Sequence, residues 1–211
     1  MSTFMACAAA DLEPGADPRQ LLEAIAEASR QQPLAQHATQ PAAAWIRSTD
    51  EGARVSLLAD SGNTWLAEAL AIAAARVPGL RRAILALDHD EYGAEHIILA
   101  GSGEGLRRLQ HVYVYPDGEP DDEFEPTLTD VAVPDGLDVA PDGTVNGPAS
   151  WSAVAALYGV PLEPVERAGR YAEVAHEELG TIFTPFEPWW EAVHARYPFE
   201  LGQPDLALGP A

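Results

Sequence analysis

The sequence predicts an α+β fold, in which an antiparallel sheet is flanked by helices and closed by a helical C-terminal segment. Two observations lead to this prediction. Residues 54–115 alternate as a strand, a helix and then three strands joined by short turns, which is typical of an antiparallel meander packed on a helix. From residue 149 the pattern is helical, and three of the five tryptophans fall in this last third. This concentration of aromatic residues predicts a local core that docks the C-terminal helices onto the sheet.

The first helix is predicted over residues 19–32. Asp17 supplies a cap, Pro18 suits the first helical position, and apolar residues follow at helical spacing. Residues 34–44 show no periodicity and predict a surface connection. Residues 1–10 are small and apolar without a preceding basic residue, so they predict a loose N-terminus rather than a signal peptide.

The central elements follow from short apolar runs between turn signals. Residues 101–105 are rich in glycine, but only a few residues separate them from the next strand, too few for the crossover helix of a dinucleotide site. A plain turn between two strands is therefore predicted there. The elements expected are strands at 54–59, 82–87, 95–100 and 106–115 and a helix at 65–77.

The chain divides into three parts, which we expect to form one compact domain. These are an N-terminal helix and connection over residues 1–44, a sheet of about four to six strands with one helix over 45–140, and a helical segment over 141–211. Residues 116–145 are expected to form either a long loop with brief strands at 127–133 and 137–140 or a linker to the segment that follows. The last part contains predicted helices at 149–158, 163–179 and 186–196.

Adjacent tryptophans at 189 and 190 constrain the packing of the last predicted helix. Neighbouring helical positions point about 100° apart, so both rings are buried only if the helix lies between the sheet and another helix. We expect Trp189 or Trp190 to be deeply buried and the other to be at least half covered.

The charge of the chain restricts its partners. Thirty-three acidic residues face twelve arginines and no lysine, which gives a formal charge of −21. Such a field repels nucleic acids and anionic membranes, and it attracts basic proteins. A single cysteine and the absence of any apolar stretch of about 20 residues favour a cytoplasmic protein without disulfides.

An acidic segment provides the candidate contact surface. Residues 116–145 contain ten acidic residues and no arginine. We therefore predict an acidic, cytoplasmic protein-binding protein that neutralises a basic partner, as small acidic antitoxin and immunity proteins do. The residues expected to contact this partner are Asp121, Asp122, Glu123, Phe124 and Glu125.

The first alternative is a metal-dependent or small-molecule enzyme built on the turn at residues 88–96 and on His111. Its candidate metal ligands are Asp88, His89, His96 and His111, because carboxylates and imidazoles at one end of a sheet can converge on a metal. Acid-rich turns are more often solvated, and the sequence has no Gly-x-Ser-x-Gly nucleophile motif. The sequence favours a binding protein over an enzyme, and we expect no cofactor.

Two Glu-x-x-His pairs also resemble metal-ligand spacing. Glu173 with His176 and Glu191 with His194 would each share one helix face. Carboxylate-bridged metal bundles use this spacing, but they need four long helices, whereas glycine and proline interrupt this region. We interpret both pairs as solvated, acidic helix faces.

The second alternative is a DNA-associated regulator. Residues 154–170 have the pattern of a helix-turn-helix, with a glycine turn between two helices. The second helix would offer only Arg167 and Arg170 beside Glu163 and Glu166, too few cations for phosphate contacts. We expect this helical hairpin to serve packing.

Overall fold

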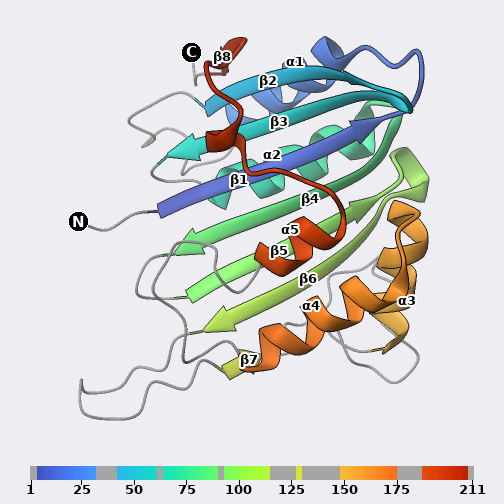
Figure 1. Cartoon of the computed structure of the whole chain (residues 1–211). Coiled ribbons are helices and arrows are strands. Elements are labelled where there is room, and N and C mark those ends of the chain that lie inside the picture. Colours follow the sequence, from blue (N-terminus) through green and yellow to red (C-terminus); the bar gives the residue numbers. More distant parts are fainter. Residues whose placement is uncertain are drawn as a thin grey trace.

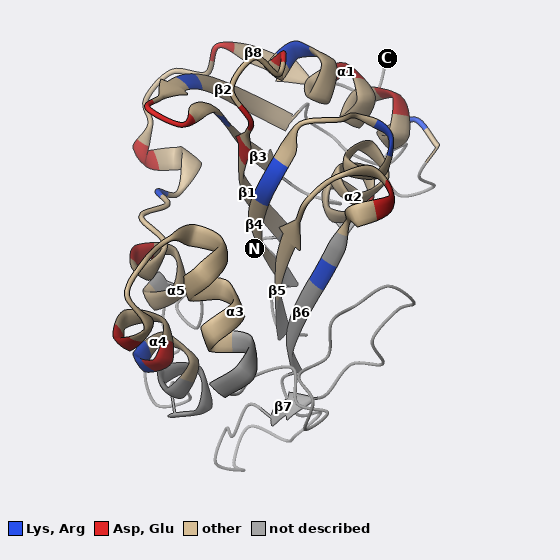
Figure 2. Cartoon of the chain, turned by 90° about the vertical axis from the view of Figure 1, so that its right-hand side faces the viewer, with Lys and Arg blue, Asp and Glu red and all other residues tan. Residues whose placement is uncertain are grey.

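The protein has three layers, with a sheet between two layers of helices (Figures 1 and 2). The computed structural model describes residues 4–31, 42–60, 64–89, 93–114, 127–129, 148–174 and 187–208. Within these described residues, eight strands form one sheet in the order β7-β6-β5-β4-β1-β3-β2-β8, and every neighbouring pair is antiparallel. The predicted α+β class, an antiparallel sheet flanked by helices, is therefore confirmed.

Six strands have at least eight residues, and the two edge strands have three. The strands are β1 (Phe4–Leu12), β2 (Ala42–Thr49), β3 (Gly52–Asp60), β4 (Leu80–His89), β5 (Gly93–Ala100), β6 (Arg107–Val114), β7 (Thr127–Thr129) and β8 (Leu206–Leu208). The helices are α1 (Pro18–Ser29), α2 (Thr64–Arg76), α3 (Pro148–Tyr158), α4 (Leu162–Val174) and α5 (Glu187–Ala192). Two short 3-10 turns are η3 (Gly103–Gly105) and η6 (Pro198–Glu200). The glycine-rich residues 101–105 form a turn between β5 and β6, as predicted.

The first six elements form two interleaved βαβ units. The order β4-β1-β3-β2, with α1 following β1 and α2 following β3, is the connectivity of ferredoxin-like folds. β1 lies between β3 and β4 and pairs with both along its length. The expectation of a loose N-terminus is therefore wrong, since residues 4–12 form a central strand of the sheet.

Small residues allow β1 to be covered on both faces. Ala6, Ala8 and Ala10 belong to the core under α1 and α2, whereas Cys7 and Ala9 belong to the core under the C-terminal helices. Successive residues of a strand face opposite sides, so the short side chains let both helical layers approach. β1 consequently belongs to two cores.

The layer formed by α1 and α2, hereafter the N-terminal layer, packs as the helical spacing predicts. Leu21, Ile25, Leu66 and Leu70 are fully buried against the sheet. The Asp17 carboxylate accepts a hydrogen bond from the backbone N–H of Arg19 at 2.9 Å, which caps α1. The predicted cap and the first-turn proline are both confirmed.

The second layer, formed by α3, α4 and α5, is hereafter the C-terminal layer. Trp189 and Trp190 are 0% and 1% exposed. The Trp189 ring lies 5.5 Å from the ring of His96 in β5, and the Trp190 ring stacks on Tyr197 at 4.4 Å. The prediction that one tryptophan is deeply buried and the other at least half covered is confirmed, and both are in fact fully buried.

The hairpin of α3 and α4 packs onto the sheet, as expected for residues 154–170. Gly159 between the helices has a φ of +64°, a conformation that favours glycine. Its N–H donates to the carbonyl of Ala156, and the next N–H donates to the carbonyl of Ala155. The hairpin and the sheet share one core, which includes Val154, Tyr158, Val165, Ala168, Ile84 and Ile98.

Gly169 in α4 makes close packing of the hairpin possible. A Cβ at this position would overlap the indole ring of Trp151 in α3. In an unconstrained helix, Gly→Ala stabilises by about 1 kcal/mol. We expect Gly169→Ala to lower the free energy of unfolding by about 1–3 kcal/mol instead, because overpacking displaces Trp151.

Urea denaturation of this variant tests that expectation, and Gly105→Ala is the matched control. A Cβ added to Gly105 would have no neighbour within 4 Å, and the φ of Gly105 is not positive. This substitution is expected to change the free energy of unfolding by less than about 0.5 kcal/mol. A stabilising Gly169→Ala would show that α3 and α4 are not in this close contact.

The division into residues 1–44, 45–140 and 141–211 stays a prediction, although β1 and β8 join the sheet from outside 45–140. The expected strand at 137–140 and most of the acidic segment lie outside the described residues. Among the described helices, none has the length and apolar character needed to cross a membrane.

Candidate functional site

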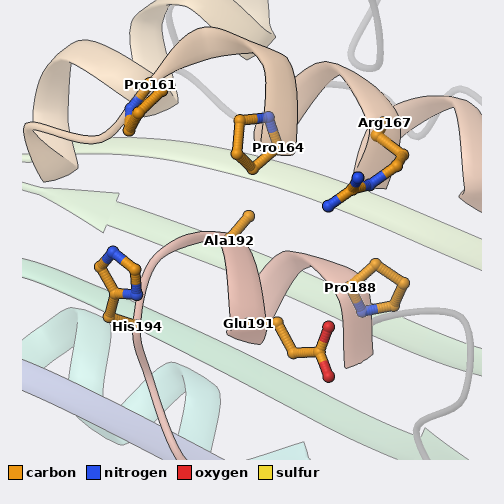
Figure 3. Close-up of a pocket in the computed structure, with 7 residues that line it drawn as sticks. All are labelled: Pro161, Pro164, Arg167, Pro188, Glu191, Ala192 and His194. Atoms are coloured by element: carbon orange, nitrogen blue, oxygen red, sulfur yellow. The ribbon is translucent and has the colours of Figure 1, made fainter.

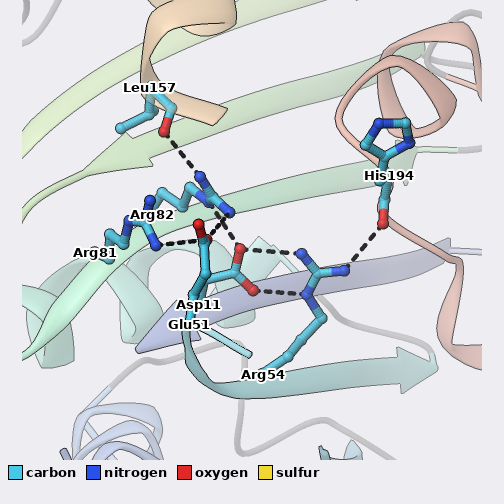
Figure 4. Close-up of polar contacts among 7 residues, drawn as sticks. All are labelled: Asp11, Glu51, Arg54, Arg81, Arg82, Leu157 and His194. Atoms are coloured by element: carbon cyan, nitrogen blue, oxygen red, sulfur yellow. Dashed lines mark hydrogen bonds and ion pairs between the residues drawn. The ribbon is translucent and has the colours of Figure 1, made fainter. Parts of the chain in front are cut away.

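Asp11 near the end of β1 is the centre of a cluster with Arg54 and Arg82. The strand register places Asp11 opposite Arg54 of β3 and opposite Arg82 of β4. Arg54 donates from Nε and Nη2 to the two carboxylate oxygens of Asp11 at 2.6 and 3.0 Å. Arg82 Nε donates to Asp11 Oδ2 at 2.8 Å (Figure 4). We call these three residues the Asp11 cluster.

The Asp11 cluster is largely withdrawn from solvent. Burial would raise the pKa of Asp11, but the hydrogen bonds and positive charges of Arg54 and Arg82 outweigh it and lower that pKa below its ordinary value. The hydrogen bond to Asp11 in turn raises the pKa of Arg54. The Arg82 guanidinium also lies 4.5 Å above the ring of Tyr158, whose pKa is raised by burial.

The two arginines connect the sheet to the C-terminal layer. Arg82 Nη1 donates to the carbonyl of Leu157 at 2.9 Å, in the last turn of α3. Arg54 Nη1 donates to the carbonyl of His194 at 3.0 Å, just after α5. A cation near a helix C-terminus satisfies a free carbonyl and the helix dipole together. The Asp11 cluster thereby holds the ends of two helices on the sheet.

His194 has a backbone conformation that is unusual for its side chain. Its φ is +54°, and it is the only non-glycine residue with a positive φ among those the structure describes. Its N–H donates to the carbonyl of Glu191, and the N–H of Ala195 donates to the carbonyl of Trp190. This is the same helix-ending motif that Gly159 forms after α3. Non-glycine residues in this region carry strain and are enriched at functional sites.

The predicted helix at 186–196 is consequently shorter than expected. α5 ends at Ala192, and His194 lies in the turn beyond it. Glu191 and His194 do not share a regular helix face, so that part of the prediction is wrong. The pairing of Glu173 with His176 stays a prediction, because residue 176 lies outside the described residues.

A cavity of about 190 Å³ opens beside the Asp11 cluster. We call it the arginine cavity, because three of the twelve arginines of the chain line it. Arg81 Nη1 donates to Glu51 Oε2 at 2.6 Å, and Arg82 Nη2 approaches the same oxygen at 3.3 Å (Figure 4). The lining residues are Asp11, Leu12, Thr49, Glu51, Arg54, Arg81, Arg82 and His194. This arrangement of guanidinium groups is suited to binding an anion.

A second cavity of about 340 Å³ lies between α4 and α5 on the outer side of the C-terminal layer. Figure 3 shows the prolines of both elements around it, with Arg167 on α4 and Glu191 on α5. Pro161, Pro164, Arg167, Pro188, Glu191, Ala192 and His194 line this groove. Its mixed charges do not specify one ligand.

The predicted metal ligands are distributed over three neighbouring strands. His96 in β5 is the register partner of His111 in β6, and Asp88 in β4 is the partner of Ala94, two residues before His96. His89 pairs with Phe4 of β1. The described residues contain no group of three or more His, Cys, Asp or Glu placed to hold a metal. The metal site stays a prediction, because the side chains of Asp88, His89 and His111 are not described.

Cys7, the single cysteine of the chain, lies in surroundings that suppress the reactivity of its thiol. The side chain is completely buried in the core beneath the C-terminal layer. Burial raises the pKa of the Cys7 thiol far above its ordinary value. Because the thiolate is the reactive species, Cys7 acts as a small core residue.

Sequence patterns did not reveal the Asp11 cluster or the strain at His194. The cluster could have been predicted only if residues 4–12 had been recognised as a strand, because the pairing of this strand with β3 and β4 brings Asp11 between two arginines. The predicted contact residues 121–125 lie outside the described residues. Comparisons with protein-family models, with curated proteins and with solved structures found no match to this chain.

Proposed function

We propose that this chain is an acidic binding protein that associates with a basic protein partner and neutralises it. The distribution of charge along the chain carries the proposal. Residues 1–114 contain 14 acidic residues and 9 arginines, whereas residues 115–211 contain 19 acidic residues and 3 arginines. A concentrated negative field accelerates association with a cationic partner and orients it. We therefore assign the partner-binding face to the second half of the chain.

The outer surface of the C-terminal layer supports this assignment. Glu163, Glu191 and Glu200 are exposed in or beside this layer, and the ribbon in Figure 2 marks acidic residues in red on α4 and α5. The two exposed large apolar side chains among the described residues, Leu162 and Phe199, belong to the same half of the chain. Apolar anchors surrounded by polar residues are typical of protein interfaces.

Phe199 is the stronger anchor candidate, because it is exposed but held in place. Phe199 is 56% exposed, and its ring stacks on that of Tyr197 with 5.3 Å between the ring centres. Tyr197 stacks in turn on the buried Trp190. A rigid aromatic side chain loses little conformational entropy on binding. This stack supports Phe199 as a preorganised contact for the partner.

The cellular setting is part of the same proposal. A chain with one buried cysteine suits a reducing cytoplasm. Neutralising a basic protein there is what small acidic antitoxin and immunity proteins do, and the acidic segment at Asp121, Asp122, Glu123, Phe124 and Glu125 would extend the contact surface. The same negative field disfavours nucleic acids and anionic membranes as partners.

Affinity capture with the whole immobilised chain tests the proposal in a lysate of the native host. We expect a retained protein rich in lysine and arginine, which is then purified and titrated against the chain. Its association rate should fall by about tenfold or more between 0.05 M and 0.5 M NaCl, since salt screens electrostatic steering. A captured partner that is not basic, or whose association rate is independent of salt, would contradict the proposal.

The acidic segment gives a specific prediction for the same purified partner. Replacing Asp121, Asp122, Glu123 and Glu125 together with arginine should slow association several-fold at low salt. The effect should be much smaller near 1 M salt, where the screening length is about 3 Å. Association that is unchanged at low salt would remove this segment from the contact surface.

A further inference from the structure

The arginine cavity has room and donors for a small anion. Its volume is about 190 Å³. One water molecule occupies about 30 Å³ of liquid, so this space holds an oxyanion together with some of its hydration water. Thr49 adds a hydroxyl to the guanidinium groups of Arg54, Arg81 and Arg82. Guanidinium groups bind planar carboxylates and phosphate oxygens in paired hydrogen bonds.

Arg82, which is buried, and Arg54, which is half-buried, are both fixed before any ligand arrives. Arg82 is held by Asp11, by the carbonyl of Leu157 and by the ring of Tyr158. Arg54 is held by Asp11 and by the carbonyl of His194. Each guanidinium has five N–H donors, and these fixed contacts use two on Arg82 and three on Arg54. Rigid donors of this kind lose little entropy when they bind an anion.

The Glu51 carboxylate occupies the position at the mouth of the cavity where a bound anion would contact Arg81 and Arg82. Its carboxylate bridges Arg81 and Arg82 from the turn between β2 and β3, yet its side chain is 59% exposed. Exposed ion pairs contribute little to stability, so this carboxylate can be exchanged for another anion at low cost. The Asp11 carboxylate cannot be exchanged in this way, because it is buried between two arginines.

The charges indicate how many negative charges the ligand carries. With Glu51 displaced, three arginines face only Asp11 among the acidic residues that line the cavity, which leaves a formal local charge of +2. A dianion balances this charge, whereas a single carboxylate balances half of it. Acidic residues farther away than the screening length of about 8 Å at physiological salt have little influence on this balance.

We propose that the arginine cavity binds a small dianionic oxyanion of the phosphate type, which replaces Glu51 on Arg81 and Arg82. Two features beside the cavity support a binding role. β1 has an irregular pairing with β4 directly after Asp11, and bulges of this kind are frequent next to functional sites. The strained His194 lies on the cavity wall, and its carbonyl accepts the hydrogen bond that fixes Arg54.

Calorimetric titration of the whole chain with inorganic phosphate tests the proposal, with acetate at equal ionic strength as the monoanion. We expect phosphate to bind more tightly than acetate. Glu51→Ala should tighten phosphate binding several-fold, because it removes the competing carboxylate. Arg81→Gln should weaken binding by about tenfold, the effect of losing one charge-assisted hydrogen bond. The control is Arg30→Gln, which removes an exposed arginine at the end of α1 and should leave phosphate binding unchanged.

The opposite responses of the Glu51 and Arg81 variants make the test specific. Circular dichroism checks that both variants are folded, which is expected because Glu51 is exposed and Arg81 is about one-third exposed. Phosphate binding that is the same in Arg81→Gln and in the unchanged protein would place the anion elsewhere and overturn the proposal. It would also be overturned if Glu51→Ala weakened phosphate binding or left it unchanged. The proposal would also be overturned if phosphate at about 10 mM gave no heat of binding with the Glu51→Ala variant. This concentration is ten times a weak Kd of about 1 mM, so even weak binding would be detected.

Discussion

Trp189→Ala is expected to lower the free energy of unfolding by about 3–5 kcal/mol, a large part of the stability of a typical domain. The Trp189 side chain is fully buried between α5 and the sheet and lies against His96. Its removal leaves a cavity in a core to which the sheet contributes short side chains such as Cys7, Ala9 and Ala86, and such side chains are too small to fill the space. Urea denaturation followed by circular dichroism gives the measurement.

Phe199→Ala is the matched control for this substitution, since it removes an exposed aromatic ring from the same part of the chain. Its cost is expected to be below about 1 kcal/mol. A loss below about 1 kcal/mol for Trp189→Ala as well would show that α5 is not packed on the sheet. Trp189 and Trp190 would then be available as a binding surface.

Asp11→Asn is expected to lower the free energy of unfolding by about 3 kcal/mol. The substitution keeps the size of the side chain but removes the negative charge between Arg54 and Arg82. Breaking a buried ion pair on one side leaves uncompensated charge, and this is the main cost. The control is Asp50→Asn, which removes the same charge from an exposed side chain and should cost less than about 0.5 kcal/mol.

The effect of Asp11→Asn should depend on pH with a definite sign. The pKa of Asp11 is lowered in the folded protein, so folding favours the ionised form. The stabilisation is therefore complete above the unfolded-state pKa of about 3.9 and is lost as the pH falls through the lower folded-state pKa. The difference between the two proteins, measured by urea denaturation from pH 7 to pH 3, should shrink below about pH 4. A difference that grows on acidification would contradict the role assigned to Asp11.

Local signals in the sequence were sufficient for most of the helices and for several strands. Asp17 and Pro18 marked the start of α1, and turn signals between short apolar runs marked α2 and the strands around it. The strand β1 could not be recognised in the same way. Alanine is a strong helix former, and a strand that is buried on both faces lacks alternating polarity. Only the two helical layers and the pairing with β3 and β4 make residues 4–12 a strand.

The candidate sites show the same limit. Asp11, Arg54 and Arg82 are far apart in the sequence, and only the register of three strands brings them together. His194 occupies a helix-ending position that glycine usually takes. A histidine at this position gives no sequence signal of a helix end, so the strained backbone could not be predicted. The net charge, by contrast, can be read from the composition without knowing the fold. The proposed function follows from this acidic charge.

The central claim is that the outer surface of the C-terminal layer attracts a basic partner. Two triple variants with the same change in net charge test it, each replacing three exposed glutamates with arginine. The first carries Glu163→Arg, Glu191→Arg and Glu200→Arg on the C-terminal half, and the control carries Glu13→Arg, Glu23→Arg and Glu27→Arg in or beside the N-terminal layer.

The deciding measurement is the association rate of each variant with the purified basic partner at 0.05 M NaCl. We expect the C-terminal variant to associate about tenfold more slowly than the unchanged protein. The association rate of the control should fall much less, because electrostatic steering depends on charges near the contact surface. Equal losses in the two variants would mean that only net charge matters, and a larger loss in the control would place the partner on the opposite layer. Either result would contradict the assignment of the C-terminal layer as the binding face.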